Sequence, residues 1–229
     1  MTTTSSRSKK KRTSSKARSR SRGRRSARGG NLFLWLFLGV LVVLFGVIAF
    51  ISRSDVGTGV NITPAEVTGD PLPPLEPEAP DGAVGAQAPT ISGTSISGEP
   101  ATIEPGDGTP KAIVFLAHWC PHCQREVPTV VQWLQDSGLP EGVELLGVAT
   151  GIDRNRPNYP PHDWLEREEW DVPTIVDGNQ AANQAYGLVS YPFWVLVDGE
   201  GKVVQRWAGE TTPEQLTERI GQLAEDGAS

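Results

Sequence analysis

The chain contains two cysteines, and both lie in the segment Trp119-Cys120-Pro121-His122-Cys123. Two thiols separated by two residues can close into one disulfide, so this spacing predicts reversible redox chemistry. The alternatives are a metal site and a pair of inert cysteines that only pack. A structural zinc site usually includes a second Cys or His pair at short spacing, and here there are only three scattered histidines, His118, His122 and His162. We therefore favour redox chemistry and expect no bound metal.

An apolar run precedes the cysteines and an amphipathic run follows them. Residues 112–117 predict a short buried strand, whereas Val127, Val130, Val131 and Leu134 recur at the spacing of one helical face. The cysteines therefore lie where a strand turns into the N-terminus of a helix. There the unpaired backbone N–H groups and the helix dipole favour a thiolate, which is the nucleophilic form of cysteine.

This position predicts different tasks for the residues of the motif. We expect Cys120 to attack a substrate sulfur, and Cys123, one helical turn further on, to resolve the resulting mixed disulfide. Pro121 fits the first helical position, where its missing N–H is not needed. His122 places a titratable and potentially positive group beside Cys120, which would stabilise its thiolate.

Trp119 and the two cysteines, followed by Pro128 five residues after Cys123, resemble the motif of the thioredoxin superfamily. Two further features resemble the membrane-anchored TlpA/ResA-type branch of that superfamily. They are Glu126, two residues before that proline, and Ala88-Pro89 far upstream. The resemblance covers about residues 84–224. It implies an α/β fold with a central mixed sheet and flanking helices. It also implies a thiol-disulfide oxidoreductase whose redox group is the Cys120-Cys123 disulfide itself, with no dissociable cofactor.

The same resemblance implies a second part of the site. Pro192 precedes the apolar run at 193–197 and matches the proline that is cis in thioredoxin folds and packs against the cysteines. Its implied role is to present the backbone of Tyr191 to the extended chain of a substrate. Tyr191 would then help to set substrate preference. The other interpretation is an ordinary trans proline that starts an edge strand.

Two departures from the family concern proton transfer and the direction of electron flow. Many thioredoxins carry an acid in the strand before the motif, but the equivalent position here is Val114, so Cys123 would lose its proton to Glu126 or to water. The Pro-His insert resembles that of DsbA-like oxidants and favours a moderately oxidising pair. The TlpA/ResA-like scaffold is mostly that of reductants, so the direction stays open.

The N-terminal part of the chain differs in charge from the rest. Residues 1–30 contain twelve lysines and arginines and no acid, which predicts a disordered basic arm. Residues 31–51 form an uncharged apolar run. At a rise of about 1.5 Å per residue this run matches a hydrocarbon core of about 30 Å. The run is longer than the apolar region of a cleaved signal peptide and lacks a small-x-small cleavage site, so we predict an uncleaved transmembrane signal anchor.

The positive-inside rule places the basic arm in the cytoplasm and everything after the anchor outside the cell membrane. Dithiols and disulfides can interchange in that compartment. We expect the arm to contact anionic lipid headgroups rather than nucleic acid. The expected partners are the membrane, substrate proteins with thiols or disulfides, and an unidentified redox partner.

The remaining chain divides by composition. Residues 52–87 are rich in proline, glycine and acid and predict a tether, and residues 88–229 predict the thioredoxin-like domain. Within the domain we expect strands at 112–117, 143–149, 173–177, 193–197 and 202–207, and helices at 121–136, 179–186 and 213–224. The segment 151–171 resembles an insertion of TlpA-like proteins. Either its His162, Trp164 and Trp170 line a partner-binding surface, or the two tryptophans cap the sheet and His162 is exposed to solvent.

Two rival functions share parts of this pattern. A copper-handling protein of the Sco kind has the same scaffold and anchor, but it uses Cys-x-x-x-Cys with a distant histidine. A thiol peroxidase of the peroxiredoxin kind needs a Pro-x-x-x-Thr-x-x-Cys context, which is absent here. The sequence therefore predicts a membrane-anchored, extracytoplasmic thiol:disulfide oxidoreductase.

Overall fold

The computed structural model describes residues 36–42, 62–76 and 78–227. Residues 36–42 form a short, exposed helix in a unit separate from residues 57–229. Among the described residues, no helix is both long and apolar enough to cross a membrane. The predicted arm at 1–30 and most of the predicted anchor at 31–51 lie outside the described residues.

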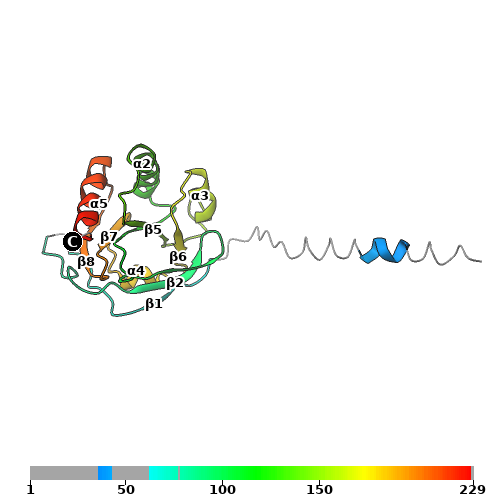
Figure 1. The fold of residues 1–229 in the computed structure, drawn as a ribbon, viewed down its shortest axis with the longest axis horizontal. Coiled ribbons are helices and arrows are strands. Elements are labelled where there is room, and N and C mark those ends of the chain that lie inside the picture. The colour runs from blue at the N-terminus through cyan, green and yellow to red at the C-terminus, as the bar shows by residue number, and fades with distance from the viewer. Residues whose placement is uncertain (1–35, 43–61, 77, 228–229) are drawn as a thin grey trace, which may run out of the picture. The chain divides into compact units, whose positions relative to one another are not determined.

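A mixed sheet of eight strands forms the centre of the described part of the larger unit (Figure 1). Its order is β1-β2-β6-β5-β4-β7-β8, and β3 pairs with β2 beside this path. β4 pairs in parallel with β5, and β5 with β6, whereas the other pairs are antiparallel. The strands are β1 Glu66–Thr68, β2 Thr90–Ser95, β3 Pro100–Ile103, β4 Lys111–Leu116, β5 Glu144–Ala149, β6 Thr174–Val176, β7 Phe193–Val197 and β8 Val203–Ala208.

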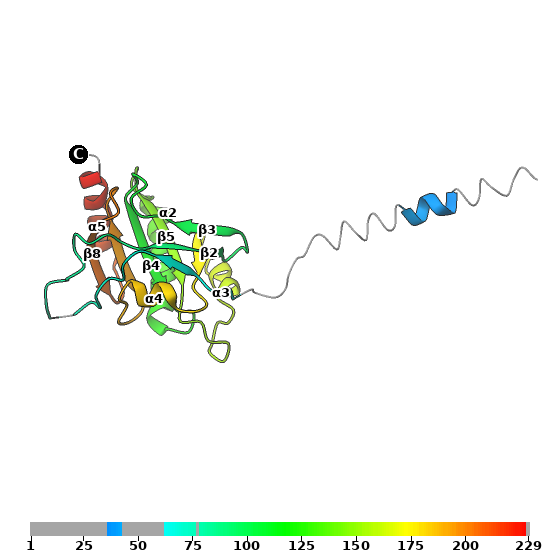
Figure 2. The ribbon, with the colours of Figure 1, turned by 90° about the horizontal axis from the view of Figure 1, so that it is seen from below.

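Helices cover both faces of this sheet (Figure 1). α2 (Pro121–Ser137), α3 (Pro161–Arg167) and α5 (Pro213–Gly227) lie on one face. α4 (Ala181–Ala185) lies on the other, which is the face nearest the viewer in Figure 2.

The side chains of β4 explain these two layers. Ala112, Val114 and Leu116 pack with α2 and α5, whereas Ile113 and Phe115 pack in the cluster on the α4 side. β4 is therefore buried on both faces, which accounts for its continuous apolar sequence.

Residues 62–87 differ from the tether predicted for 52–87. β1 pairs with β2, and three side chains of this stretch are buried in the cluster on the α4 side, Ala65, Leu72 and Ala83. The buried guanidinium of Arg206 in β8 pairs with Asp81 and donates a hydrogen bond of 3.0 Å to the Pro73 carbonyl. The folded unit therefore begins before Ala88, because scattered apolar residues and one ion pair anchor a stretch whose composition is that of a linker.

The segment predicted as an insertion, 151–171, forms a loop followed by α3. Trp164 and Trp170 are buried in the cluster between α2 and the sheet, so they pack against the core rather than line a partner surface. Trp170 also donates a hydrogen bond of 2.9 Å from Nε1 to Thr174 Oγ1. His162 is half-buried at the start of α3.

Candidate active site

Cys120 and Cys123 lie at the N-terminal end of α2, a few residues after β4. Cys120 is the N-cap of the helix and Pro121 is its first residue. Both cysteines are free thiols; Cys120 is 6% exposed, whereas Cys123 is fully buried. The strand-to-helix position predicted from the sequence is therefore confirmed. It gives the pair an outer sulfur, which a substrate can reach, and an inner one, which it cannot.

Cys123 is held as a thiol by its surroundings. Burial raises its pKa, and a hydrogen bond from the Ala117 N–H to its Sγ, at 3.4 Å, offsets only part of that effect. The charge of Glu126 raises the Cys123 pKa further. Cys123 therefore needs a base before it can act as a nucleophile.

The segment at Tyr191 and Pro192 faces Cys120. The peptide bond between these two residues is cis, as the resemblance implied, and Pro192 is buried. The Cys120 thiol donates to the Tyr191 carbonyl oxygen at 3.4 Å. The Tyr191 ring meets the Trp119 ring edge-on, with 6.1 Å between centroids. The backbone of Tyr191 therefore lies directly beside the Cys120 sulfur.

Glu126 points into the protein from the first turns of α2. Its Oε1 accepts a hydrogen bond of 2.7 Å from Trp194 Nε1, and its Oε2 accepts one of 2.8 Å from the Thr211 N–H. Only 1% of the residue is exposed, and burial raises the pKa of the carboxyl group. A buried acid thus lies near Cys123. It comes from the helix, whereas the strand position at which many thioredoxins carry an acid is the apolar Val114.

His122 and Arg125 are exposed and share one carboxylate. His122 Nδ1 lies 2.5 Å from Glu210 Oε1, and Arg125 Nη2 donates to the same oxygen at 2.6 Å. Arg125 first, and His122 second, lower the pKa of Glu210 to about 2. The sequence predicted a role for His122 but gave no sign of Arg125 or Glu210, because Glu210 follows the motif by more than eighty residues.

His118, which had no predicted role, is buried and forms hydrogen bonds with the loop after β5. The Asp153 N–H donates to its Nε2 at 3.2 Å, so its Nδ1 carries the proton that is donated to the Pro157 carbonyl at 2.7 Å. Burial lowers the pKa of His118, which keeps this neutral form. The loop is thereby held beside Trp119, whose Nε1 donates to the Gly151 carbonyl at 2.7 Å.

A hollow lies between this loop and the active site. Arg156 stacks over the Trp119 ring, with its guanidinium carbon 4.5 Å from the ring centroid. Because Trp119 and Tyr191 both line the hollow, it adjoins the approach to Cys120. Its lining residues are Trp119, Gly151, Ile152, Asp153, Arg156, Gln180 and Tyr191.

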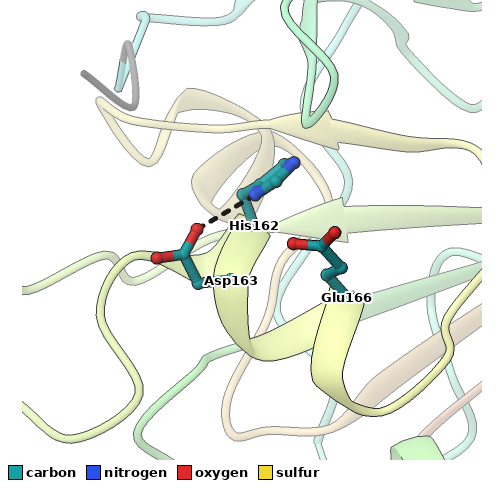
Figure 3. Close-up of side chains that lie close together, drawn as sticks. All are labelled: His162, Asp163 and Glu166. Atoms are coloured by element: carbon teal, nitrogen blue, oxygen red, sulfur yellow. Dashed lines mark hydrogen bonds and ion pairs between the residues drawn. The ribbon is translucent and has the colours of Figure 1, made fainter. Parts of the chain in front are cut away.

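His162, Asp163 and Glu166 on α3 offer ligand atoms that all lie within 4.8 Å of one another (Figure 3). Within the described ranges, this is the one group of three histidine, cysteine or acidic residues with such spacing. It includes neither cysteine, and both ring nitrogens of His118 have partners. The geometry therefore does not favour the rival copper function at the cysteines.

A protein-family model described as Redoxin matches residues 83–220, which is more than half of the chain. The chain belongs to the redoxin family. Thiol-disulfide oxidoreductase ResA of Bacillus thuringiensis subsp. konkukian is 25% identical to this redoxin over 140 residues, covering 61% of this chain and 78% of the relative. ResA of Geobacillus thermodenitrificans is 28% identical over 138 residues, covering 60% and 76%.

Solved structures show the fold of this redoxin. A thioredoxin-family thiol:disulfide interchange protein from Chlorobium tepidum aligns with a TM-score of 0.51 at 20% identity, over 69% of this chain and 99% of that one. The thioredoxin domain of a thiol-disulfide oxidoreductase from Bacteroides vulgatus aligns with a TM-score of 0.50 at 23% identity, over 62% and 98%. With the ResA relatives, these matches make this redoxin a thiol-disulfide oxidoreductase of the ResA-like branch with a thioredoxin-like fold.

Proposed function

We propose that this redoxin is anchored in the cell membrane by one N-terminal helix and exchanges disulfides with substrate proteins outside the cytoplasm. The observation that carries the exchange is the pairing of an outer Cys120 at the start of α2 with a fully buried Cys123. The basic arm at 1–30 and the apolar run at 31–51 support the anchor and its orientation.

The first step in the reducing direction joins Cys120 to the substrate. The Cys120 thiolate attacks one sulfur of a substrate disulfide; that S–S bond breaks and a Cys120–substrate S–S bond forms. The other substrate sulfur leaves as a thiolate and takes a proton. The Tyr191 carbonyl, which faces the Cys120 Sγ at 3.4 Å, lies where the backbone of an extended substrate would align.

The second step releases the substrate. Cys123 gives its proton to the Glu126 carboxylate, and its sulfur then attacks the Cys120 Sγ. The mixed disulfide breaks, the substrate leaves as a second thiolate, and the Cys120-Cys123 disulfide forms. Two electrons have passed from the cysteine pair to the substrate, and a partner dithiol protein must return them. The same steps in reverse oxidise a substrate dithiol, so the potentials of the partners set the direction.

Labelling in intact cells tests the proposed topology. Both cysteines of the chain lie in the active site, so a membrane-impermeant maleimide added after mild reduction reports the side on which the domain lies. We expect Cys120 to be labelled to the same extent in intact and in lysed cells. The Cys120→Ser variant, which keeps only the buried Cys123, is the control and should stay unlabelled. Labelling that requires lysis would place the domain in the cytoplasm and contradict the proposal.

A further inference from the structure

The turn between β8 and α5 contacts the active site at three consecutive residues. The Gly209 N–H donates to the Pro192 carbonyl at 2.8 Å. Glu210 binds His122, and the Thr211 N–H donates to Glu126 Oε2 at 2.8 Å. One short turn therefore joins the cis-proline segment, the exposed side of the active-site helix and the buried carboxyl group.

Glu210 holds two basic groups of α2 at once. The Arg125 Nε lies 3.1 Å from both carboxylate oxygens, in addition to the contact from its Nη2. Arg125 Nη2 also lies 3.0 Å from His122 Nδ1. A carboxylate accepts only, so the contact of 2.5 Å with Glu210 Oε1 requires the hydrogen on His122 Nδ1, and Arg125 Nη2 then donates to Glu210 rather than to His122. The guanidinium of Arg125 and the Nδ1–H of His122 are both directed at Glu210. The charge of Arg125 nevertheless interacts electrostatically with Cys120.

We propose that Glu210 sets the redox potential of the Cys120-Cys123 pair by holding His122 and Arg125 on its carboxylate, which weakens the positive field at the Cys120 sulfur. The inference rests on the proposed redox function and deepens it. Glu210 is a positioning residue, because it acts through His122 and Arg125.

The physical reason lies in which redox state carries the charge. A cation near Cys120 stabilises its thiolate, which exists only in the reduced pair, and so makes the pair more oxidising. The Pro-His insert by itself predicts such an oxidant. Glu210 opposes this effect of the insert. It therefore lowers the redox potential of the pair towards that of the reductants with which this scaffold is mostly associated.

Of the other titratable and charged groups near the site, Glu126 also senses the charge of Glu210, which raises the pKa of Glu126 in addition to the larger effect of burial. Glu126 and Cys123 lie on the inner side of α2, and the Tyr191 hydroxyl has a partner in Asn183. On the loop after β5, Arg156 and Asp153 pair with each other at 3.8 Å. The effect of Glu210 on Glu126 persists in a chain without His122 and Arg125, so that background separates it from the effect through the two basic groups.

The test is the Glu210→Gln variant, which keeps the size of the side chain and removes its charge. The full chain, purified in detergent, is equilibrated in mixtures of reduced and oxidised glutathione at neutral pH. We expect the equilibrium constant to shift about threefold to fivefold towards the dithiol, the upper part of the range for an exposed charge pair. For a two-electron couple this is a rise of about 15 to 20 mV. The thiolate absorbance of Cys120 should also develop at lower pH than in the unchanged chain.

Two further variants make the result specific. Glu218→Gln, on the exposed side of α5, removes the same charge elsewhere and should leave the potential unchanged. In the His122→Gln, Arg125→Gln background, Glu210→Gln should shift the equilibrium constant by less than about twofold, since its two partners are gone. A shift of full size in that background would overturn the holding mechanism.

The outcomes separate this inference from the proposed function. A Glu210→Gln chain with the potential of the Glu218→Gln chain would overturn the inference alone. An unchanged chain that forms no Cys120-Cys123 disulfide in any glutathione mixture would instead overturn the proposed function.

Discussion

Replacement of Cys123 by serine is expected to trap substrate proteins on Cys120 as stable mixed disulfides. The buried thiol that breaks the mixed disulfide is then missing, whereas the outer Cys120 remains beside the Tyr191 carbonyl. Replacement of Cys120 by serine should lower the rate of exchange by about three orders of magnitude or more, because the attacking sulfur is lost. Non-reducing electrophoresis of whole-cell extracts, followed by mass spectrometry of the adducts, measures the first effect, and reduction of a disulfide-containing protein measures the second.

The matched control is the double serine variant. The chain has no cysteine outside the motif, so this variant must form no adduct at all. Adducts of similar yield on Cys123 in the Cys120→Ser chain would reverse the assignment of the attacking and the resolving sulfur.

Replacement of Glu126 by glutamine is expected to slow the release of substrate from Cys120 by about 100-fold, the range of general acid–base catalysis. Burial raises the pKa of Cys123, so its proton must pass to a base, and the carboxyl group of Glu126 is buried close by. Glutamine keeps the shape of the side chain but cannot take the proton. Rapid quenching of a preformed mixed disulfide at successive times measures the release rate.

The pH profile distinguishes this chemical role from a structural one. Burial raises the pKa of Glu126 above its usual value of 4.5. In the unchanged chain the release rate should therefore rise as the pH passes through that raised pKa, because the carboxylate is the base. The Glu126→Gln chain should lack this limb of the profile, and an unaltered rate and profile would exclude Glu126 as the base.

The stability of the Glu126→Gln chain supplies the control. A raised folded-state pKa means that Glu126 contributes stability below pH 4.5 and loses that contribution as the pH rises through the raised value. At neutral pH the glutamine chain carries no buried charge, but its amide NH2 faces one of the two donors that bind Glu126, the Trp194 Nε1–H or the Thr211 N–H, so we expect a loss of stability of about 1 to 3 kcal/mol. A slow release in a chain that is still fully folded at the assay temperature then reports on proton transfer.

The sequence predicted the parts of this site that depend on local patterns. The apolar run before Cys120 and the helical periodicity after Cys123 placed the cysteines at a strand-to-helix turn, and the resemblance placed a cis proline at Pro192. The inward direction of Glu126 was also readable, because Cys123, Glu126, Val127 and Val130 share one helical face.

The rest of the site depends on contacts between distant parts of the chain. Glu210 lies 88 residues from His122 and 85 from Arg125, and no local pattern indicates that they meet. Residues 62–87 have the composition of a linker, yet the ion pair of Asp81 with Arg206 and a few buried apolar side chains hold them against the domain. Composition describes the average of such a stretch, whereas its packing depends on single residues.

The measurement that tests the central claim most directly is the redox equilibrium of the cysteine pair in the full chain. The chain is equilibrated in glutathione buffers of graded ratio, its free thiols are alkylated, and the state of Cys120 and Cys123 is read by mass spectrometry. We predict one two-electron transition between the dithiol and the Cys120-Cys123 disulfide, at a potential between about −270 mV and about −120 mV, the values of thioredoxin and DsbA. Cysteines that stay reduced at every ratio, or that form only glutathione adducts, would contradict the account.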